Sequence, residues 1–130
     1  MLTCVIVTPE ETAFEEETSF VALPLFDGEI GIASGHSPLI GRLGFGEMRL
    51  KANDKLIHYY LDGGFVQVAD NVVTVLTNRA IPAEQLEADV AVEQLAAALA
   101  RPAHSPELME SRDRVVNQAR AQLRMARGGD

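Results

Sequence analysis

The sequence predicts an α+β chain in two parts: an N-terminal antiparallel β-sandwich over residues 1–82 and a C-terminal two-helix antiparallel hairpin over residues 83–130. Before Pro82, short runs rich in Val, Ile, Thr and Tyr are separated by Gly, Pro, Asn or Asp, which is typical of strands and turns. After Pro82, apolar residues recur with a helical period. A chain of 130 residues suits one small domain with an appendage.

Six segments of the N-terminal part carry strand signals. Glu47–Lys51 alternates polar and apolar residues, as a half-buried strand does. Asn53-Asp54 and Asp70-Asn71 tolerate a left-handed backbone and predict turns, while Gly63-Gly64 permits a bulge or a tight corner. Many short strands at this spacing predict a sandwich or barrel. The expected strands are Leu2–Val7, Ser19–Leu23, Glu47–Lys51, Leu56–Leu61, Phe65–Ala69 and Val72–Thr77.

Two further features of this part predict turns or surface. Gly41, Gly44 and Gly46 follow no strand–turn–helix pattern, so we expect them in turns. The consecutive acids Glu15–Glu17 cannot share one face of a strand, so they predict a solvated surface and not a paired-carboxylate site.

The C-terminal part predicts two helices separated by a break at Arg101–His104. Ser105 suits an N-cap, Pro106 suits the first turn of the second helix, and Gly128-Gly129 ends it. Because both apolar stripes are rich in Ala, they bury little, and we expect this hairpin to open more readily than the sandwich. The first stripe contains Ala88, Val92, Leu95, Ala96 and Leu99, and the second contains Leu108, Val115, Ala119, Leu123 and Ala126.

Charge and composition exclude several classes of partner. A formal net charge of −8, an aromatic content of 5% and the absence of Trp argue against nucleic acid or anionic lipid as the main partner. Basic residues gather near the C-terminus, which indicates either a tail that meets an acidic surface or a solvated helix face. The single cysteine, Cys4, lies in an apolar run and predicts a buried core residue in a reducing compartment.

The hydropathy pattern predicts a soluble chain. No apolar stretch approaches the ~20 residues that span a bilayer. Strand-like sequence begins at Leu2, where a signal peptide would show a charged and then an apolar region. We therefore expect any association with a membrane to be indirect, through another protein.

No nucleotide-binding, metal or catalytic motif occurs in its standard form, neither a GxxxxGK[ST] loop nor HExxH. Asp27, Ser34 and His36 are close in sequence, but no nucleophile-elbow pattern supports a catalytic serine. The sequence thus predicts a chain that is not an enzyme and needs no cofactor or metal. Residues Leu23–Ile40, rich in Gly and Pro, predict either a rigid display loop or simply a hairpin with a long turn.

Within that segment, Pro24–Ile32 fits the pattern P-x-x-[DE]-G-E-x-G-I, and Gly35–Leu39 fits G-H-x-P-L. Together with matches further along the chain, these segments resemble the epsilon subunit family of F-type ATP synthases, called delta in mitochondria. The resemblance extends from Leu2 to about Glu93, and loosely over the second helix. The further matches are Thr8-Pro9-Glu10, Gly46-Glu47-Met48-Arg49, Gly63-Gly64-Phe65 and Val72–Leu76.

The resemblance implies a non-catalytic rotor subunit at the foot of the central stalk. Such a subunit binds the gamma subunit and the ring of membrane c subunits, turns with them, and links proton flow to ATP synthesis. The expected location is the cytoplasmic face of a bacterial inner membrane, with the stromal face of a thylakoid as the alternative. A free-standing ligand-binding sandwich with a dimerising hairpin is the competing hypothesis.

By position, the resemblance also implies two sets of contact residues on the sandwich. Glu29 would pair with an Arg of a c-subunit loop, and the alternative for Glu29 is a solvated turn acid. The c-ring set is Phe26, Asp27, Gly28, Glu29 and His36. The gamma set is Thr8, Leu39, Ile40 and Arg42.

For the helices, the resemblance implies that they extend to contact the alpha and beta subunits and inhibit ATP hydrolysis. The arginines that would meet acidic segments of the beta subunits are Arg112, Arg114, Arg120, Arg124 and Arg127. Some family members bind ATP through a motif like [IL]-D-x-x-R-A. Here Leu86 is followed by Glu87 in place of the Asp, and Val90 replaces the Arg, so the resemblance does not extend to ATP binding.

Overall fold

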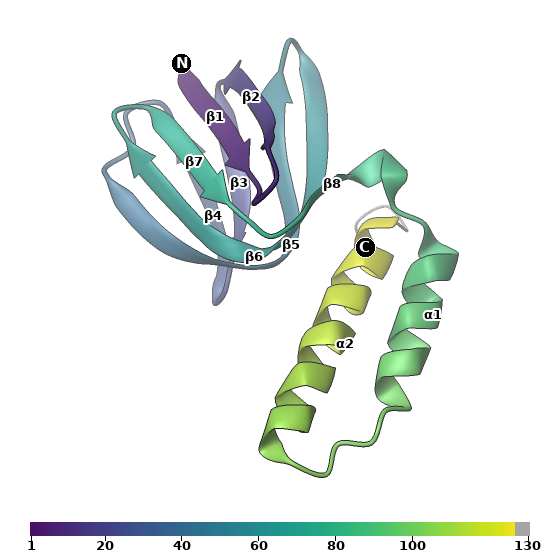
Figure 1. The fold of residues 1–130 in the computed structure, drawn as a ribbon. Coiled ribbons are helices and arrows are strands. Elements are labelled where there is room, and N and C mark those ends of the chain that lie inside the picture. Colours follow the sequence, from purple (N-terminus) through teal and green to yellow (C-terminus); the bar gives the residue numbers. More distant parts are fainter. Residues whose placement is uncertain (127–130) are drawn as a thin grey trace. The chain divides into compact units, whose positions relative to one another are not determined.

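The computed structural model describes residues 1–126, and these divide into two units after Pro82. The first unit is built from strands and the second from helices, which confirms the predicted fold class (Figure 1). The strands are β1 (Leu2–Val7), β2 (Thr12–Thr18), β3 (Phe20–Leu25), β4 (Gly28–Ala33), β5 (Leu39–Ala52), β6 (Lys55–Ala69), β7 (Val72–Leu76) and β8 (Ala80–Pro82). The helices are the 3₁₀ turn η1 (Ala83–Gln85), α1 (Ala88–Leu99) and α2 (Pro106–Ala126).

The strands pair in the order β2-β1-β7-β6-β5-β3-β4, with β8 added to β6. β1 and β7 run parallel, a departure from the antiparallel sandwich that was predicted, while the other pairs are antiparallel. β1 pairs with β2 on one side and with β7 on the other, so the N-terminal strand is hydrogen-bonded along both edges.

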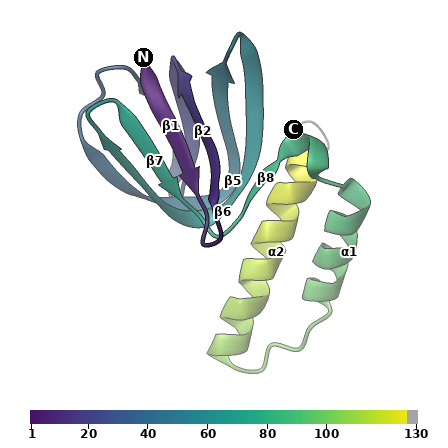
Figure 2. The same cartoon turned by 45° about the horizontal axis from the view of Figure 1, so that its top comes forward.

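β5 and β6 are long enough to take part in both layers of the sandwich, and they curve around one end of it (Figure 2). The bend lies at Gly44 on β5 and at Gly63-Gly64 on β6, where the two glycines of β6 have φ values of +76° and +108°. A Cβ on Gly44 would lie 2.9 Å from the carbonyl oxygen of Leu25, and a Cβ on Gly64 would overlap the carbonyl oxygen of Leu76. Only glycine permits these close approaches.

The expectation that Gly41, Gly44 and Gly46 lie in turns is therefore wrong. All three lie inside β5. Gly41 and Gly46 let the end of β3 pack closely, because Cβ atoms there would meet Leu25 at 3.3 Å and Pro24 at 3.0 Å. A strand needs such small residues where another strand crosses it closely.

The core is formed by the inward-facing, alternate residues of the strands. Cys4 is fully buried in it, as predicted. The alternation of buried and half-buried residues along Leu2–Val7 follows the period of two that strands impose. The largest fully buried side chains are Tyr60, Leu2, Ile6, Leu23, Ile32, Met48, Leu50, Leu61, Val21, Val66, Val68 and Val73.

β2, β4 and β8 were not expected from the sequence. β2 contains Glu15–Glu17, which are exposed as predicted but belong to a strand at the end of the sheet order. Charged side chains are common on such edges, since they discourage pairing with other chains. β4 begins directly after a two-residue turn, so the segment Leu23–Ile40 contains a tight hairpin and not a long loop.

In the second unit, α1 and α2 lie antiparallel and pack against each other (Figure 1). The predicted N-cap is present, since Ser105 Oγ accepts a hydrogen bond from Leu108 N at 3.1 Å. The expected end of α2 at Gly128-Gly129 lies outside the described residues.

The apolar stripe predicted for α1 is only partly buried, since Ala88 and Leu95 are half-buried and its other members are exposed. Val92 is 42% exposed and Leu99 is 52% exposed, whereas Ala91 and Ala98 are buried. Alanines let two helix backbones approach closely, so Ala91 and Ala98 are the most buried residues of the face that packs. On α2, Val116 and Ala119 are buried and Leu108 is exposed. Within residues 1–126, no helix is long and apolar enough to cross a membrane.

Candidate protein-binding surface

The tip of the β3–β4 hairpin presents an exposed aromatic side chain that is held in place by Arg42. Leu25 pairs with Gly28, so Phe26 and Asp27 form a two-residue turn. Phe26 is 67% exposed, yet its backbone N donates a hydrogen bond to the carbonyl oxygen of Arg42 at 2.9 Å. The guanidinium carbon of Arg42 lies 4.2 Å from the centroid of the Phe26 ring. A cation–π contact and a backbone hydrogen bond therefore hold an exposed aromatic ring in one place.

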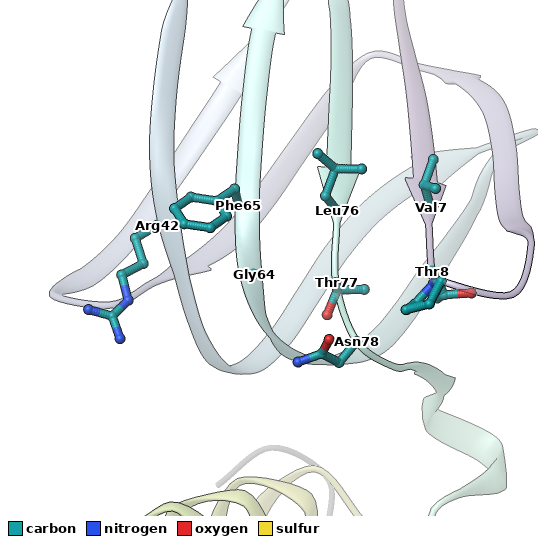
Figure 3. A pocket seen from close by; sticks show the side chains of 9 residues that line it. Val7, Thr8, Arg42, Gly64, Phe65, Leu76, Thr77 and Asn78 are labelled. Atoms are coloured by element: carbon teal, nitrogen blue, oxygen red, sulfur yellow. The ribbon is translucent and has the colours of Figure 1, made fainter.

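A pocket of about 720 Å³ opens beside Arg42 (Figure 3). Phe65 lies between Arg42 and Leu76 across three adjacent strands, since it pairs with both in the sheet register. The rest of the pocket comes from the end of β1 and the segments that follow β1 and β7. The lining residues are Val7, Thr8, Pro9, Arg42, Gly64, Phe65, Leu76, Thr77 and Asn78.

The sheet face around this pocket exposes several large apolar side chains. Ile40 is 76% exposed, Phe65 55%, Leu76 47% and Val72 37%. They project from β5, β6 and β7, which are adjacent strands. Large apolar side chains gathered on one surface make that surface a candidate for contact with a partner. We call the surface formed by Ile40, Arg42, Phe65, Val72 and Leu76 the apolar sheet face.

Comparison with known proteins identifies the family. Residues 1–83 match the family model described as ATP synthase, Delta/Epsilon chain, beta-sandwich domain. The ATP synthase epsilon chain of Rhodopirellula baltica is 51% identical over 124 residues, which cover 95% of this chain and 97% of that protein. This chain belongs to the delta/epsilon chain family of ATP synthases. The resemblance drawn from the sequence motifs is thereby confirmed.

Two solved structures share the fold of this epsilon-family chain. One is from the Euglena gracilis mitochondrial ATP synthase, an OSCP/F1/c-ring structure, with a TM-score of 0.83, 20% identity and coverage of 92% of this chain and 78% of that one. The other is from the central stalk and c-ring of the Tetrahymena thermophila mitochondrial ATP synthase, with a TM-score of 0.76, 13% identity and coverage of 96% of both chains. The fold thus persists at low sequence identity.

Of the residues expected to contact gamma, the structure brings three together. Thr8 and Arg42 line the pocket, and Ile40 projects from the same strand as Arg42. Leu39 packs against the core instead, because neighbouring residues of a strand face opposite sides. Sequence reasoning missed Phe65 and Leu76. Both residues could have been found from the sequence, because each is a large apolar residue at a position of a predicted strand that faces outward.

The residues expected to contact the c-ring do not form one surface. Phe26, Asp27 and Gly28 lie at one end of β4, whereas His36 lies in the connection that follows its other end. That connection is tied down, because His36 N donates to the carbonyl oxygen of Ala33 at 3.2 Å and Gly35 N donates to Asn71 Oδ1 at 2.7 Å. The expected set therefore divides into two separate parts.

Glu29 is neither a turn residue nor unpaired. It lies on β4, and its Oε1 accepts a hydrogen bond from Arg49 at 2.9 Å. Arg49 also contacts Glu47 at 3.3 Å. Hydrogen bonding to Glu29, with a further contribution from Glu47, raises the pKa of Arg49. The family motif thus places Glu29 in an ion pair within the sheet, with its side chain about half exposed.

In the helical unit, the arginines of α2 are spread over more than one face. Arg120 and Arg124 are exposed and four residues apart, so they share a side of the helix. Arg112 and Arg120 line a smaller pocket of about 360 Å³. Arg114 is exposed, and Arg127 lies outside the described residues.

The segment that departs from the ATP-binding motif spans the start of α1, since Leu86 and Glu87 precede the helix and Val90 lies within it. Leu86 is half-buried, and Glu87 is the N-cap of α1 without a side-chain hydrogen bond to the helix. Within residues 1–126, no group of three or more His, Cys, Asp or Glu side chains is placed to hold a metal ion.

Proposed function

We propose that this chain is a non-catalytic subunit of the ATP synthase central stalk that couples ion movement to ATP synthesis. The observation that carries the proposal is the apolar sheet face with its pocket, on a unit that belongs to the delta/epsilon family. A rotor subunit transmits torque only through interfaces that do not slip. A two-layer β unit with a packed core supplies the stiffness, and its exposed side chains supply the contact.

The apolar sheet face is proposed as the contact with the gamma subunit. Phe65 and Leu76 offer apolar area, and the pocket between β1 and β5 admits a side chain from a partner. Arg42 at the rim adds a charge that pairs with a partner carboxylate. An apolar centre with a charged rim is the usual anatomy of a stable protein interface.

The hairpin tip is proposed as the contact with the c-ring. Phe26 and Asp27 project from the unit in a fixed geometry, because Arg42 holds the ring and the backbone of Phe26. Glu29 lies two residues beyond Asp27 and is paired with Arg49. An Arg on a c-subunit loop would replace Arg49 as the ion-pair partner of Glu29, so that Glu29 would remain paired in the complex. His36 would take part only through a separate contact.

The helical unit is proposed as a brake on ATP hydrolysis. Arg112, Arg114, Arg120 and Arg124 give α2 positive charge for acidic segments of the beta subunits, and the small-residue packing of Ala91 and Ala98 makes the hairpin easy to open. The proposed location is peripheral, at the cytoplasmic face of a bacterial inner membrane, with the stromal face of a thylakoid as the alternative.

The gamma contact is tested by capture of purified gamma subunit on immobilised chain. Phe65→Asp places a charge in the centre of the apolar sheet face, and we expect it to weaken capture at least about a hundredfold, as the loss of an interface anchor does. Leu56→Asp is the matched control, since Leu56 is 63% exposed on the same strand β6 but outside the apolar sheet face. Equal capture by both variants would contradict the proposed surface.

The brake is tested by deletion of residues 83–130 in the assembled complex. We expect the ATP hydrolysis rate to rise and ATP synthesis to remain coupled. Retained gamma with an unchanged hydrolysis rate would remove the brake from the proposal and leave the coupling role. Loss of gamma on deletion would contradict the assignment of the contact to the first unit.

A further inference from the structure

A buried polar cluster holds the strand through which the chain leaves the first unit. Asp62 is only 7% exposed, although carboxylates are rarely buried. Its Oδ1 accepts a hydrogen bond from the hydroxyl of Tyr60 at 2.8 Å, and its Oδ2 accepts one from Arg79 Nε at 3.2 Å. A buried carboxylate is tolerated when it is paired and hydrogen-bonded, so these partners fix where Asp62 and Arg79 lie.

The same cluster fixes the backbone between β7 and β8. Asp62 N lies within hydrogen-bond distance of Thr77 Oγ1, at 3.1 Å, and of the carbonyl oxygen of Arg79, at 3.2 Å. Thr77 Oγ1 donates to the same carbonyl at 3.2 Å, and Thr77 N donates to the carbonyl oxygen of Val7 at 3.0 Å. The connection is thus tied to β6 on one side and to β1 on the other.

β8 continues this attachment, and its pairing with β6 ends at Pro82, the last residue of the first unit. Ala80, Ile81 and Pro82 pair with residues 59–61 of β6. The hydrogen bonding of the next segment is local, since Leu86 N donates to the carbonyl oxygen of Ala83 at 3.1 Å. Glu87, at the start of α1, makes no side-chain cap.

We propose that Asp62, Tyr60, Thr77 and Arg79 form a clasp that makes β8 part of the rigid first unit, so that movement of the helical unit starts at Ala83. The clasp thereby sets the length of the tether. If it opened, residues 77–82 would join the tether and lengthen its reach by up to roughly 20 Å. Arg79 and Asp62 are therefore positioning residues for the helices, although neither belongs to the helical unit.

Hydrogen exchange of the full chain, measured by mass spectrometry, tests the clasp. In the unsubstituted chain we expect Ile81, whose pair with Tyr60 is a hydrogen-bonded one in this register, to exchange as slowly as β7, and residues 83–87 to exchange much faster. Arg79→Ala removes a side chain that is 48% exposed, and we expect about tenfold faster exchange at Ile81 with the rest of the first unit unchanged.

A second variant and a control separate the clasp from general stability. Asp62→Asn keeps an oxygen for the Tyr60 hydroxyl but loses the charge that holds Arg79, and we expect faster exchange at Ile81 here too. Arg49→Ala removes the ion pairs with Glu29 and Glu47 elsewhere in the unit, and we expect β8 to be unaffected. Fast exchange of Ile81 in the unsubstituted chain, or an effect of Arg79→Ala on all strands equally, would overturn the proposal.

Discussion

At the scale of single residues, the chemistry of several side chains is decided by what the fold places around them. Cys4 lies fully buried among apolar neighbours, and this burial raises the pKa of its thiol from 9.0 to about 12. A buried thiol of this kind is a weak nucleophile. Cys4 has apolar neighbours, whereas the carboxylates of Glu29 and Asp62 each form an ion pair with an arginine.

The buried thiol gives a measurable dependence of stability on pH. Above pH 9.0 the unfolded chain loses the thiol proton while the folded chain keeps it, so the free energy of unfolding decreases as pH rises towards 12. We expect Cys4 to contribute a loss of about 1.4 kcal/mol per pH unit in this range. Urea denaturation at pH 8 and pH 10, compared with Cys4→Ala to cancel the other titrating groups, measures it. Equal pH dependence in both chains would contradict the prediction.

Two glycines with left-handed backbone allow strain and steric overlap to be separated. Gly35 has a φ of +84° and open space around its missing Cβ, whereas a Cβ on Gly64 would overlap the carbonyl oxygen of Leu76. We expect Gly35→Ala to lower the free energy of unfolding by about 1 kcal/mol, from backbone strain alone. Gly64→Ala should lower it by about 3 kcal/mol more, because β6 and β7 must separate. Chemical denaturation of both variants provides the comparison, and similar losses would exclude the overlap.

At the scale of elements, the bent strands β5 and β6 decide where the partner surface lies. The two halves of β6 pair with different strands, β8 before the bend and β7 after it. At the bend, Arg42 on β5 pairs with Phe65 on β6, and Gly44 lies against the backbone of Leu25. The same bend brings the hairpin tip at Phe26 next to Arg42. Arg42 therefore belongs to both proposed contact surfaces, and the two are continuous at this residue.

The packing of α1 on α2 predicts the behaviour of the hairpin. Ala91 and Ala98 each bury only one methyl group, and burial stabilises by only about 0.8 kcal/mol per CH₂-sized group. We expect amide protons of α1 to exchange at least about a hundredfold faster than those of β6, since the hairpin opens without unfolding of the sheet. Native-state hydrogen exchange followed by NMR measures both sets in one sample. Equal protection in the two elements would show that the hairpin is as stable as the sandwich.

At the scale of the whole molecule, the two units have separate interiors. The main apolar cluster is formed by residues from Leu2 to Val75, all of them in the first unit. The helical unit has its own, smaller set of buried residues. A boundary at Pro82 thus separates a unit with a large core from one with a small one.

A chain ending at Pro82 is therefore expected to fold. Residues 1–82 keep the core cluster and the clasp around Asp62, so we expect a cooperative thermal transition and a dispersed NMR spectrum. The truncated chain should also capture gamma subunit as well as the full chain does. A truncated chain without cooperative unfolding would show that the helices are needed for the fold of the first unit.

The sequence by itself was sufficient where local chemistry decides the structure. The bounds of β1, the turns at Asn53-Asp54 and Asp70-Asn71, and the start of α2 at Ser105-Pro106 all follow from side-chain alternation, left-handed turn residues or a helix cap. These signals depend on residues that are close in the chain. The same kind of local pattern predicted the fold class, and the family motif added the position of the hairpin tip.

Only the tertiary structure decided features that depend on distant partners. β2 and β4 are strands because a neighbour pairs with their backbone, although their own residues predicted surface or loop. The ion pair of Glu29 with Arg49, the ion pair of the buried Asp62 with Arg79 and the pocket beside Phe65 each bring together residues that are distant in the sequence. Sequence periodicity reports which face of an element is apolar, but it does not report which other element covers that face. Register and packing across the sheet determine this, and they exist only in the folded chain.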